Sequence, residues 1–428
     1  MSVQLQKQLL NGRGTSGIAA ICSAHPWIIE AAALQAVEDG SSLLVEATSN
    51  QVNQEGGYTG MQPASFRSFV VGIASAAGLT EDRVYLGGDH LGPNPWNSLN
   101  STEAMQLACR MVDQYARAGF TKIHLDASMA CADDPEHLTD EVVATRAAEL
   151  CAAAERATTE SGGALPIYVV GTEVPPPGGA RHSLEHIEVT GAAAVERTLQ
   201  IHHAAFQRAG LMEAWKRVVG IVVQPGVEFD HDRVFDYSPP AARQLQSFLE
   251  SHPDIVFEAH STDYQKPPAF RELVRDGFAI LKVGPGLTFA LREAIFALAA
   301  IENELLGRDQ QSHVREVLDQ TMLDRPEYWN RYYIGTEREQ KVLRSFSYSD
   351  RIRYYWPERD VQQSVKKLLS NLDCISVPET LLSQYLPQAY GAIRSGSSIS
   401  GKALVIEHIR TELRKYTTAC NPGRAGLI

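Results

Sequence analysis

The stretch VYLGGDHLGPNPW, residues 84–96, carries the features on which the fold prediction rests. It begins as a short apolar run and ends in the polar pair Asp89 and His90, which is the pattern of a buried strand with a polar carboxyl end. The segment GPNP at 92–95 then bends the chain, and residues 102–118 have helical periodicity. Together these elements predict one βα unit of a parallel sheet.

The same succession recurs along the chain up to about residue 300. The expected strands are residues 17–23, 42–49, 84–90, 122–128, 165–173, 218–224, 255–261 and 278–284. The expected helices are residues 27–38, 64–77, 102–118, 140–160, 195–210, 240–251, 267–276 and 288–306. Eight strands, each followed by a helix, predict an α/β fold of the (β/α)8 TIM-barrel class. A doubly wound sheet is the alternative, but the segment ICSAHPW after the first strand lacks its Gly-rich turn.

The chain is longer than the barrel needs, because such a barrel takes about 250 residues. We therefore predict a barrel over residues 1–306 and an extension over residues 307–428. Helical periodicity at 313–322, 361–372, 379–390 and 402–416 predicts that the extension is helical. No Gly/Ser/Pro linker precedes it, so we expect it to pack on the barrel.

Composition and net charge favour an enzyme that acts on small molecules. Of 428 residues, 44% are hydrophobic and 21% are charged, as in ordinary globular proteins. A formal net charge of −12 disfavours nucleic acid and anionic membranes as partners. The sequence lacks an apolar run of membrane-spanning length and a secretory signal, and its six scattered cysteines form no CxxC pair. We therefore expect a cytoplasmic protein.

Polar residues end every expected strand but the first, at the place where such barrels form active sites. They are Glu46, Thr48 and Asn50; Asp89 and His90; His124, Asp126 and Ser128; Glu173; Gln224; Glu258 and His260; and Lys282. His90 and His260, with carboxylates nearby, could hold a divalent metal. Alternatively, the two histidines would hydrogen-bond a substrate hydroxyl. Because side chains alternate along a strand, the loop must turn either Asp89 or His90 towards the site.

Six ordered motifs, spread over nearly the whole chain, resemble one family. They are EATSNQVNQEGGYTGM (46–61), GGDHLGPNPW (87–96), VVGTEVPPPGG (169–179), VFEAHSTDYQ (256–265), KVGPGLTFALREA (282–294) and SFSYSDRIRYYW (345–356). The family is the Z subunit of class II tagatose-1,6-bisphosphate aldolase, formerly labelled tagatose-6-phosphate kinase, with members that are D-tagatose 6-phosphate 4-epimerases. The resemblance implies a ketohexose 6-phosphate 4-epimerase that uses metal-assisted retro-aldol chemistry. It equally allows a non-catalytic subunit that stabilises a catalytic class II aldolase subunit, and it is compatible with a homo-oligomer.

The barrel more distantly resembles the class II aldolases themselves, and this likeness implies roles for individual residues. Asp89 would transfer protons, and His90 and His260 would bind a divalent metal, with zinc as the first expectation. Glu173 would be a metal ligand or a second catalytic base. Those aldolases have a third histidine ligand on strand six where this chain has Gln224, so Glu173, Gln224 or a water would complete the shell. The residues expected to bind substrate are Glu46, Asn50, Asp126, Gln224, Glu258 and Lys282.

A phosphorylated ketohexose also needs a phosphate site. We expect Gly284 and Gly286 to offer backbone N–H groups at the start of a helix. Ser347, Ser349 and Arg351, at alternate positions, would add hydroxyls and a cation. The segment GSSISGKA at 396–403 approaches the phosphate loop of a kinase, but Ala403 lacks the required hydroxyl and the preceding segment is predicted as helix.

Overall fold

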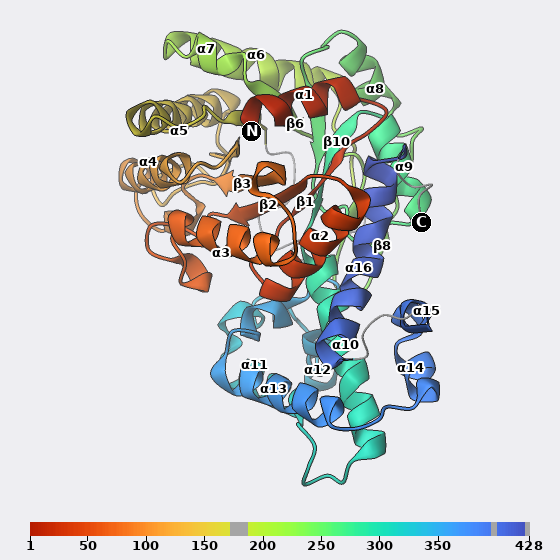
Figure 1. Cartoon of the computed structure of the whole chain (residues 1–428). Coiled ribbons are helices and arrows are strands. Elements are labelled where there is room, and N and C mark those ends of the chain that lie inside the picture. Colours follow the sequence, from red (N-terminus) through yellow and green to blue (C-terminus); the bar gives the residue numbers. More distant parts are fainter. Residues whose placement is uncertain (172–186, 395–399, 424–428) are drawn as a thin grey trace.

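A closed barrel of eight parallel strands forms the centre of the protein (Figure 1). The structure is a computed structural model that describes residues 1–171, 187–394 and 400–423. The strands are β1 (Ile18–Ile21), β2 (Leu43–Thr48), β3 (Val84–Leu91), β4 (Lys122–Leu125), β5 (Ile167–Val170), β6 (Val218–Val222), β9 (Val256–Ala259) and β10 (Phe278–Val283). They close in the order β1-β10-β9-β6-β5-β4-β3-β2. Each lies within a predicted strand or within one residue of it, so the predicted (β/α)8 barrel is confirmed.

Helices surround the barrel and connect its strands (Figure 1). They are α2 (Pro26–Asp39), α3 (Pro63–Ala76), α4 (Ser101–Arg117), α5 (Asp140–Ser161), α6 (Ala192–Arg208), α7 (Met212–Trp215), α8 (Arg243–Glu250), α9 (Pro267–Arg275) and α10 (Pro285–Leu305). Local sequence sets where several of them begin. The side chains of Asn100 and Thr139 accept backbone N–H bonds at the starts of α4 and α5.

Two parts of the barrel region were not expected from the sequence. A short hairpin, β7 (Glu228–Phe229) and β8 (Val234–Phe235), follows β6. The N-terminal helix α1 (Ser2–Gly12) buries Leu5 and Leu9 against apolar side chains at the amino ends of the strands. Most of α1 is polar, so its apolar periodicity is weak, and only its position against the barrel stabilises it.

The C-terminal region is helical, as predicted. It contains α11 (Val314–Asp324), α12 (Glu337–Phe346), the 3-10 helix η5 (Arg351–Tyr355), α13 (Arg359–Asp373), α14 (Glu379–Tyr385), α15 (Pro387–Arg394) and α16 (Gly401–Cys420). The long helices α10 and α16 run from the barrel into this region (Figure 1). Because α16 contacts α2, α9 and β1, the end of the chain returns to the outer ring of the barrel. The division at residue 306 stays a prediction.

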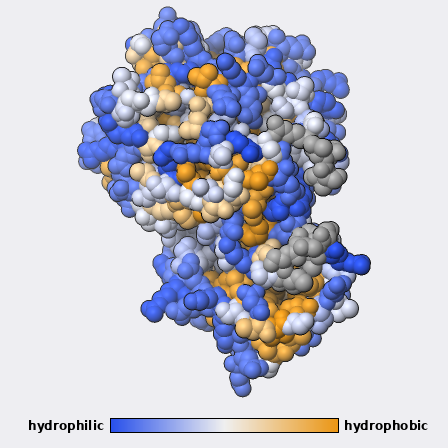
Figure 2. All heavy atoms as spheres, viewed as in Figure 1, coloured by the Kyte–Doolittle hydropathy of each residue, from blue (hydrophilic) through white to orange (hydrophobic). Residues whose placement is uncertain are grey.

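None of the described helices combines the length and the apolar composition that crossing a membrane requires. The face shown in Figure 2 is mostly hydrophilic, and hydrophobic residues gather between α2 and α16 and beside α14.

Candidate functional site

A cavity of about 360 Å³ lies at the carboxyl ends of the barrel strands. Residues at the ends of β1, β2, β3, β9 and β10 and in the loops that follow them form one part of its wall, together with Phe229 of β7. Residues between 349 and 362 of the C-terminal region form another part. Residues that line it include Cys22, Asn50, Asp89, His90, His260 and Lys282 from the barrel, and Arg353, Tyr354 and Trp356 from the C-terminal region. The barrel and the extension therefore build this site together.

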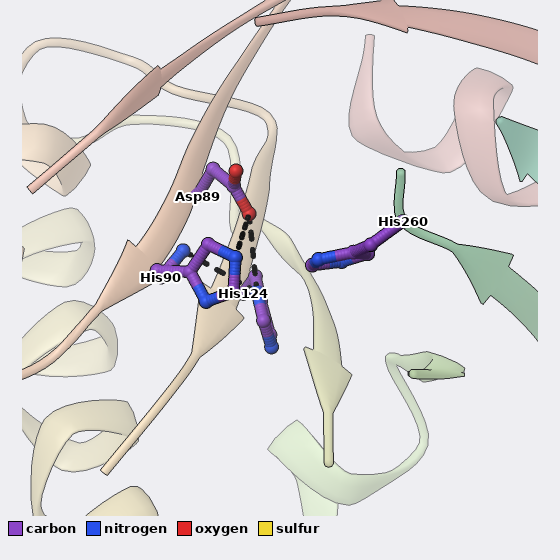
Figure 3. Close-up of side chains that lie close together, drawn as sticks. All are labelled: Asp89, His90, His124 and His260. Carbon is purple, nitrogen blue, oxygen red and sulfur yellow. Dashed lines mark hydrogen bonds and ion pairs between the residues drawn. The ribbon is translucent and has the colours of Figure 1, made fainter. Parts of the chain in front are cut away.

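Three histidines and one aspartate converge at the barrel side of the cavity (Figure 3). Asp89, His90, His124 and His260 each offer one ligand atom, and these atoms lie within 4.8 Å of one another. All four side chains are buried. The structure thus brings the predicted residues Asp89, His90 and His260 together, and it adds His124 from β4, which was not among the predicted ligands.

Each histidine of this cluster uses one ring nitrogen to contact an oxygen outside it. His90 Nδ1 lies 2.6 Å from Asp126 Oδ2, and His124 Nε2 lies 2.9 Å from the Gly171 carbonyl. His260 Nε2 lies 2.9 Å from Glu258 Oε1. The other ring nitrogens face the cluster, where His124 Nδ1 lies 3.2 Å from Asp89 Oδ1 and accepts the backbone N–H of His90 at 3.3 Å. Since metal-binding histidines are usually held in this way by a carboxylate or carbonyl, the donor set fits a divalent metal such as zinc.

The backbone at the end of β3 is bent so that Asp89 and His90 both reach the cluster. His90 has a φ of 48°, in the left-handed region that non-glycine residues rarely adopt, and the pairing with β4 shifts between Gly88 and Leu91. The loop therefore turns His90, as the alternation of side chains requires. Gly87, two residues earlier in β3, makes room for a neighbouring side chain. A Cβ there would lie 2.6 Å from Glu46 Oε1, so only glycine leaves room for that carboxylate.

A network of charged side chains lies directly beneath the histidines, in the barrel interior. Lys122 Nζ lies 2.6 Å from Glu46 and 2.7 Å from Glu258. Lys282 Nζ lies 2.6 Å from Glu46 and also pairs with Asp89. These side chains are at most 5% exposed. Glu46 and Glu258 therefore hold Lys282 and His260 in place, and Lys282 also lines the cavity.

The electrostatics of the cluster favour an ionised Asp89 beside a neutral His260. Burial alone would raise the pKa of Asp89, but His90 and Lys282 hold it well below its usual value. Burial, together with the charge of Lys282, lowers the pKa of His260 to about 3. Burial also acts to lower the pKa of His90, but Asp89 and Asp126 outweigh it and raise that pKa. A metal would displace any proton from the free nitrogen of His90.

Other residues predicted for substrate and metal binding are placed as follows. Asn50 lines the cavity, whereas Asp126 contacts His90. Gln224 Oε1 accepts the backbone N–H groups of Gly226 and Val227 at 2.8 and 3.0 Å, so its side chain shapes its own loop. Glu173, predicted as base or ligand, lies outside the described residues. Its role stays a prediction.

The residues predicted for phosphate binding already have other partners. The backbone N–H groups of Gly284 and Gly286 donate to Asp263 Oδ1, at 2.9 and 2.7 Å. The hydroxyls of Ser347 and Ser349 lie 3.2 and 3.4 Å from His231 Nδ1. The Arg351 guanidinium lies 3.0 Å from the ring centre of Tyr332. Gly284 and Ser349 line the cavity, whereas Gly286, Ser347 and Arg351 are not among its lining residues.

Comparison with known proteins identifies the family of the chain. A family described as D-tagatose-1,6-bisphosphate aldolase subunit GatZ/KbaZ-like matches residues 4–421. The chain belongs to this GatZ/KbaZ-like family. The family expected from the six sequence motifs is therefore confirmed. The protein is also 48% identical to one from Sinorhizobium meliloti 1021 described as a probable tagatose 6 phosphate kinase, with a TM-score of 0.88 over 94% of this chain and 100% of that chain.

Two further solved structures are similar at a much lower level. The fructose-bisphosphate aldolase of Campylobacter jejuni is 14% identical, with a TM-score of 0.45 over 88% of this chain and 94% of its own. The YdjI aldolase of Escherichia coli K12 is 11% identical, with a TM-score of 0.41 over 87% of this chain and 98% of its own.

Proposed function

We propose that this GatZ/KbaZ-like chain is a 4-epimerase that interconverts D-tagatose 6-phosphate and D-fructose 6-phosphate. The observation that carries the proposal is the cluster of Asp89, His90, His124 and His260, which opens into a cavity at the carboxyl end of a barrel. Membership of a family described by an enzyme that acts on a tagatose phosphate supplies the substrate class. We further propose that the protein works in the cytoplasm.

The chemistry of this epimerisation explains why such a cluster is needed. Carbon 4 of a 2-ketose is β to the carbonyl, so its hydrogen is not acidic and direct deprotonation is very costly. Breaking the C3–C4 bond avoids that step. The electron pair of the bond passes to C3 and forms the enediolate of the C1–C3 fragment, while C4 becomes an aldehyde. The aldehyde then turns its other face to C3, and the bond forms again with inverted configuration.

The side chains of the cavity are suited to the steps of this reaction. The Asp89 carboxylate is ionised, so it accepts the proton of the C4 hydroxyl as the bond breaks and returns it to the C4 oxygen as the bond reforms. Lys282 contacts Asp89 and holds the carboxylate in position. We assign Asn50 and Lys282 to the sugar hydroxyls, since both line the cavity. Glu46, Glu258 and Asp126 act through the lysines and histidines that they contact, and Glu173 stays the candidate second base.

The three histidines would hold a divalent metal, for which we propose zinc. A metal held there supplies Lewis-acid polarisation of the substrate carbonyl oxygen. With His124 in the cluster, the ligand set does not require the strand-six histidine that Gln224 replaces.

The experiment that tests the proposal uses the purified chain alone. D-tagatose 6-phosphate is supplied, and D-fructose 6-phosphate is measured with a coupled assay before chelation, after chelation and after zinc is added back. We expect turnover that is lost on chelation and restored by the metal. Turnover that persists at full rate in metal-free protein would overturn the metal-assisted mechanism, and no turnover in metal-loaded protein would overturn the epimerase.

A second candidate function is a non-catalytic subunit that stabilises a catalytic class II aldolase subunit. The observation that favours it is the family description itself, which names an aldolase subunit. In that case the chain alone would not convert D-tagatose 6-phosphate. It would instead raise the thermal stability of a co-purified aldolase subunit, and it would do so equally well when His90 is replaced by alanine.

A further inference from the structure

We propose that Arg353 binds the phosphate group of the substrate, at the side of the cavity that the C-terminal region forms. This inference rests on the proposed function for the class of substrate, a phosphorylated ketohexose. It assigns the phosphate to a residue other than those expected from the sequence, and it gives the C-terminal region a direct part in recognising the ligand.

The turn where a barrel of this kind commonly holds phosphate is already filled by a carboxylate. Barrels often bind phosphate in the loops after strands seven and eight, at a helix N-terminus. Here Asp263, from the loop after β9, accepts the N–H groups of Gly284 and Gly286 at the start of α10. A phosphate placed there would have to displace this side chain or lie against its negative charge. The anion of the substrate therefore needs another partner.

Arg353 offers the required cation in the same cavity. It belongs to η5 and lines the cavity, together with Tyr354 and Trp356. Its Nη1 donates to the carbonyl oxygens of Ser349 and Asp350, and its Nη2 donates to Tyr354 Oη at 2.9 Å. These bonds use three of the five N–H groups of a guanidinium and fix its position. Two N–H groups remain, which is the number that a two-point contact with phosphate uses.

Arg353 forms no direct ion pair with an acid in the described part of the chain, although Asp350 and Asp263 are close enough to interact with its charge. In the ranges 1–171, 187–394 and 400–423, no carboxylate oxygen lies within 4.0 Å of its guanidinium. Asp350, three residues away, pairs instead with Arg292, with 3.5 Å between Oδ1 and Nε. The hydrogen-bond partners of Arg353 among the described residues are uncharged oxygens. A guanidinium at the cavity wall that has no carboxylate in direct contact can bind a negative ligand on this side of the cavity.

The surroundings of Arg353 complete a site for the end of a sugar phosphate. Tyr58, from the loop after β2, lines the cavity and packs edge to face against Tyr354, with 5.1 Å between ring centres. These two tyrosines join the barrel to the C-terminal region beside the guanidinium. The metal cluster and Arg353 line one cavity from different walls, so one ketohexose phosphate can place its reacting carbons at the cluster and its phosphate at Arg353.

The test measures equilibrium binding without turnover, by calorimetry on the full-length, metal-free chain. The probes are D-tagatose 6-phosphate and unphosphorylated D-tagatose, and the variant is Arg353→Gln. We expect wild-type protein to prefer the phosphorylated sugar, and the variant to bind it about 10- to 100-fold more weakly, as the loss of charged hydrogen bonds implies. Binding of D-tagatose should change by less than about 3-fold. Circular dichroism and thermal unfolding check that the variant is folded.

Two further variants keep the test decisive. Arg353→Lys retains the charge but not the planar fork, so we expect a smaller loss that is again confined to the phosphorylated sugar. Asp263→Asn keeps an oxygen that accepts the two glycine N–H groups, and we expect it to leave phosphate preference unchanged. If phosphate binds at the glycine turn instead, removal of the Asp263 charge will strengthen its binding and Arg353→Gln will not weaken it.

The remaining outcomes separate this inference from the proposed function. Equal loss of both sugars in Arg353→Gln, or no preference for the phosphorylated sugar in wild-type protein, would overturn the assignment of Arg353. A chain that binds phosphate through Arg353 but never converts the sugar would overturn only the epimerase.

Discussion

The two ends of the barrel are equally buried but chemically opposite. At the amino end, Leu5 and Leu9 of α1 pack on apolar side chains such as Ile18, Leu44 and Tyr85. At the carboxyl end, the interior holds Glu46, Lys122, Glu258, Lys282 and Asp89. Burying apolar surface stabilises a fold directly, whereas burying paired charges contributes little net stability. The comparison teaches that the amino end maintains the fold and that the carboxyl end is arranged for chemistry.

Backbone strain is also concentrated at the carboxyl end of the barrel, around the cavity. Five non-glycine residues in the described part of the chain have positive φ: His90, Ser261, Tyr264, His313 and Asp350. All but His313 belong to segments that line the cavity or adjoin its lining residues. Such conformations cost about 1–3 kcal/mol each and persist where function requires them.

The largest expected effect comes from removing a histidine at the carboxyl end. His90→Ala, His124→Ala and His260→Ala should each lower the bound metal and reduce turnover by about 10³-fold or more, because a Lewis acid contributes several kcal/mol. Metal content and the rate of D-fructose 6-phosphate formation measure this effect. His203→Ala, on the outer helix α6, is the control. Full metal content in His124→Ala would remove His124 from the ligand set.

The second-largest effect, a loss of stability, is expected from breaking the charged network beneath the cluster. Lys122→Met removes one of the two lysines that Glu46 and Glu258 share, and leaves Glu258 with Lys282 only at 3.6 Å, which should cost about 3–5 kcal/mol of unfolding free energy. Chemical denaturation measures it. The exposed pair of Lys216 and Glu213 provides the control, since Lys216→Met should cost less than about 1 kcal/mol. Equal costs for the two variants would contradict the assignment of Lys122 to a buried network.

At the amino end, a substitution should change stability but not chemistry. Leu9 is 1% exposed, so Leu9→Ala should reduce the unfolding free energy by about 2–4 kcal/mol through lost burial and a cavity. The turnover per folded molecule and the metal content should stay at wild-type values. A fall in turnover without a fall in stability would show that the two ends are not separate in function.

The smallest expected effect is a pH dependence of stability that comes from Glu228 in β7. Burial raises the pKa of Glu228 from 4.5 to about 7 in the folded protein. The folded chain therefore keeps a proton that the unfolded chain releases, so the stabilisation is complete below pH 4.5 and is lost as pH rises towards 7. Between pH 5 and 8, the free energy of unfolding of Glu228→Gln should fall by about 2 kcal/mol less than that of the wild-type protein. Parallel stability curves for the two proteins would contradict this origin.

The sequence predicts the architecture well where its patterns are local. All eight barrel strands and most surrounding helices follow from apolar runs and helical periodicity. One predicted helix, residues 379–390, is divided into α14 and α15, because Pro387 disfavours a helical conformation for the residue before it. Helices α1 and α12 were not predicted, since polar residues dominate both and their few apolar contacts depend on tertiary packing.

Residues of the site could be predicted from the sequence only where they lie at the carboxyl ends of strands. Lys122 and His124 alternate along β4, and Asp126 follows the strand at the same spacing, so the signal that His124 faces the interior was present. The position of Arg351 outside the cavity lining was not accessible from the sequence. Alternate positions share a face in an extended chain, but residues 351–355 form a 3-10 helix with about three residues per turn, so alternate side chains diverge there. The contact of Asp263 with Gly284 and Gly286 joins two loops and leaves no local pattern.

The most direct test of the central claim follows the hydrogen on C4 of the substrate. D-tagatose 6-phosphate carrying deuterium at C4 is incubated in ordinary water with the metal-loaded chain alone, and the product is analysed by NMR. Retro-aldol cleavage breaks C3–C4 and leaves the C4 hydrogen in place, so we expect D-fructose 6-phosphate that retains its deuterium at C4. Loss of the deuterium to solvent, or the absence of the epimer, would contradict the account.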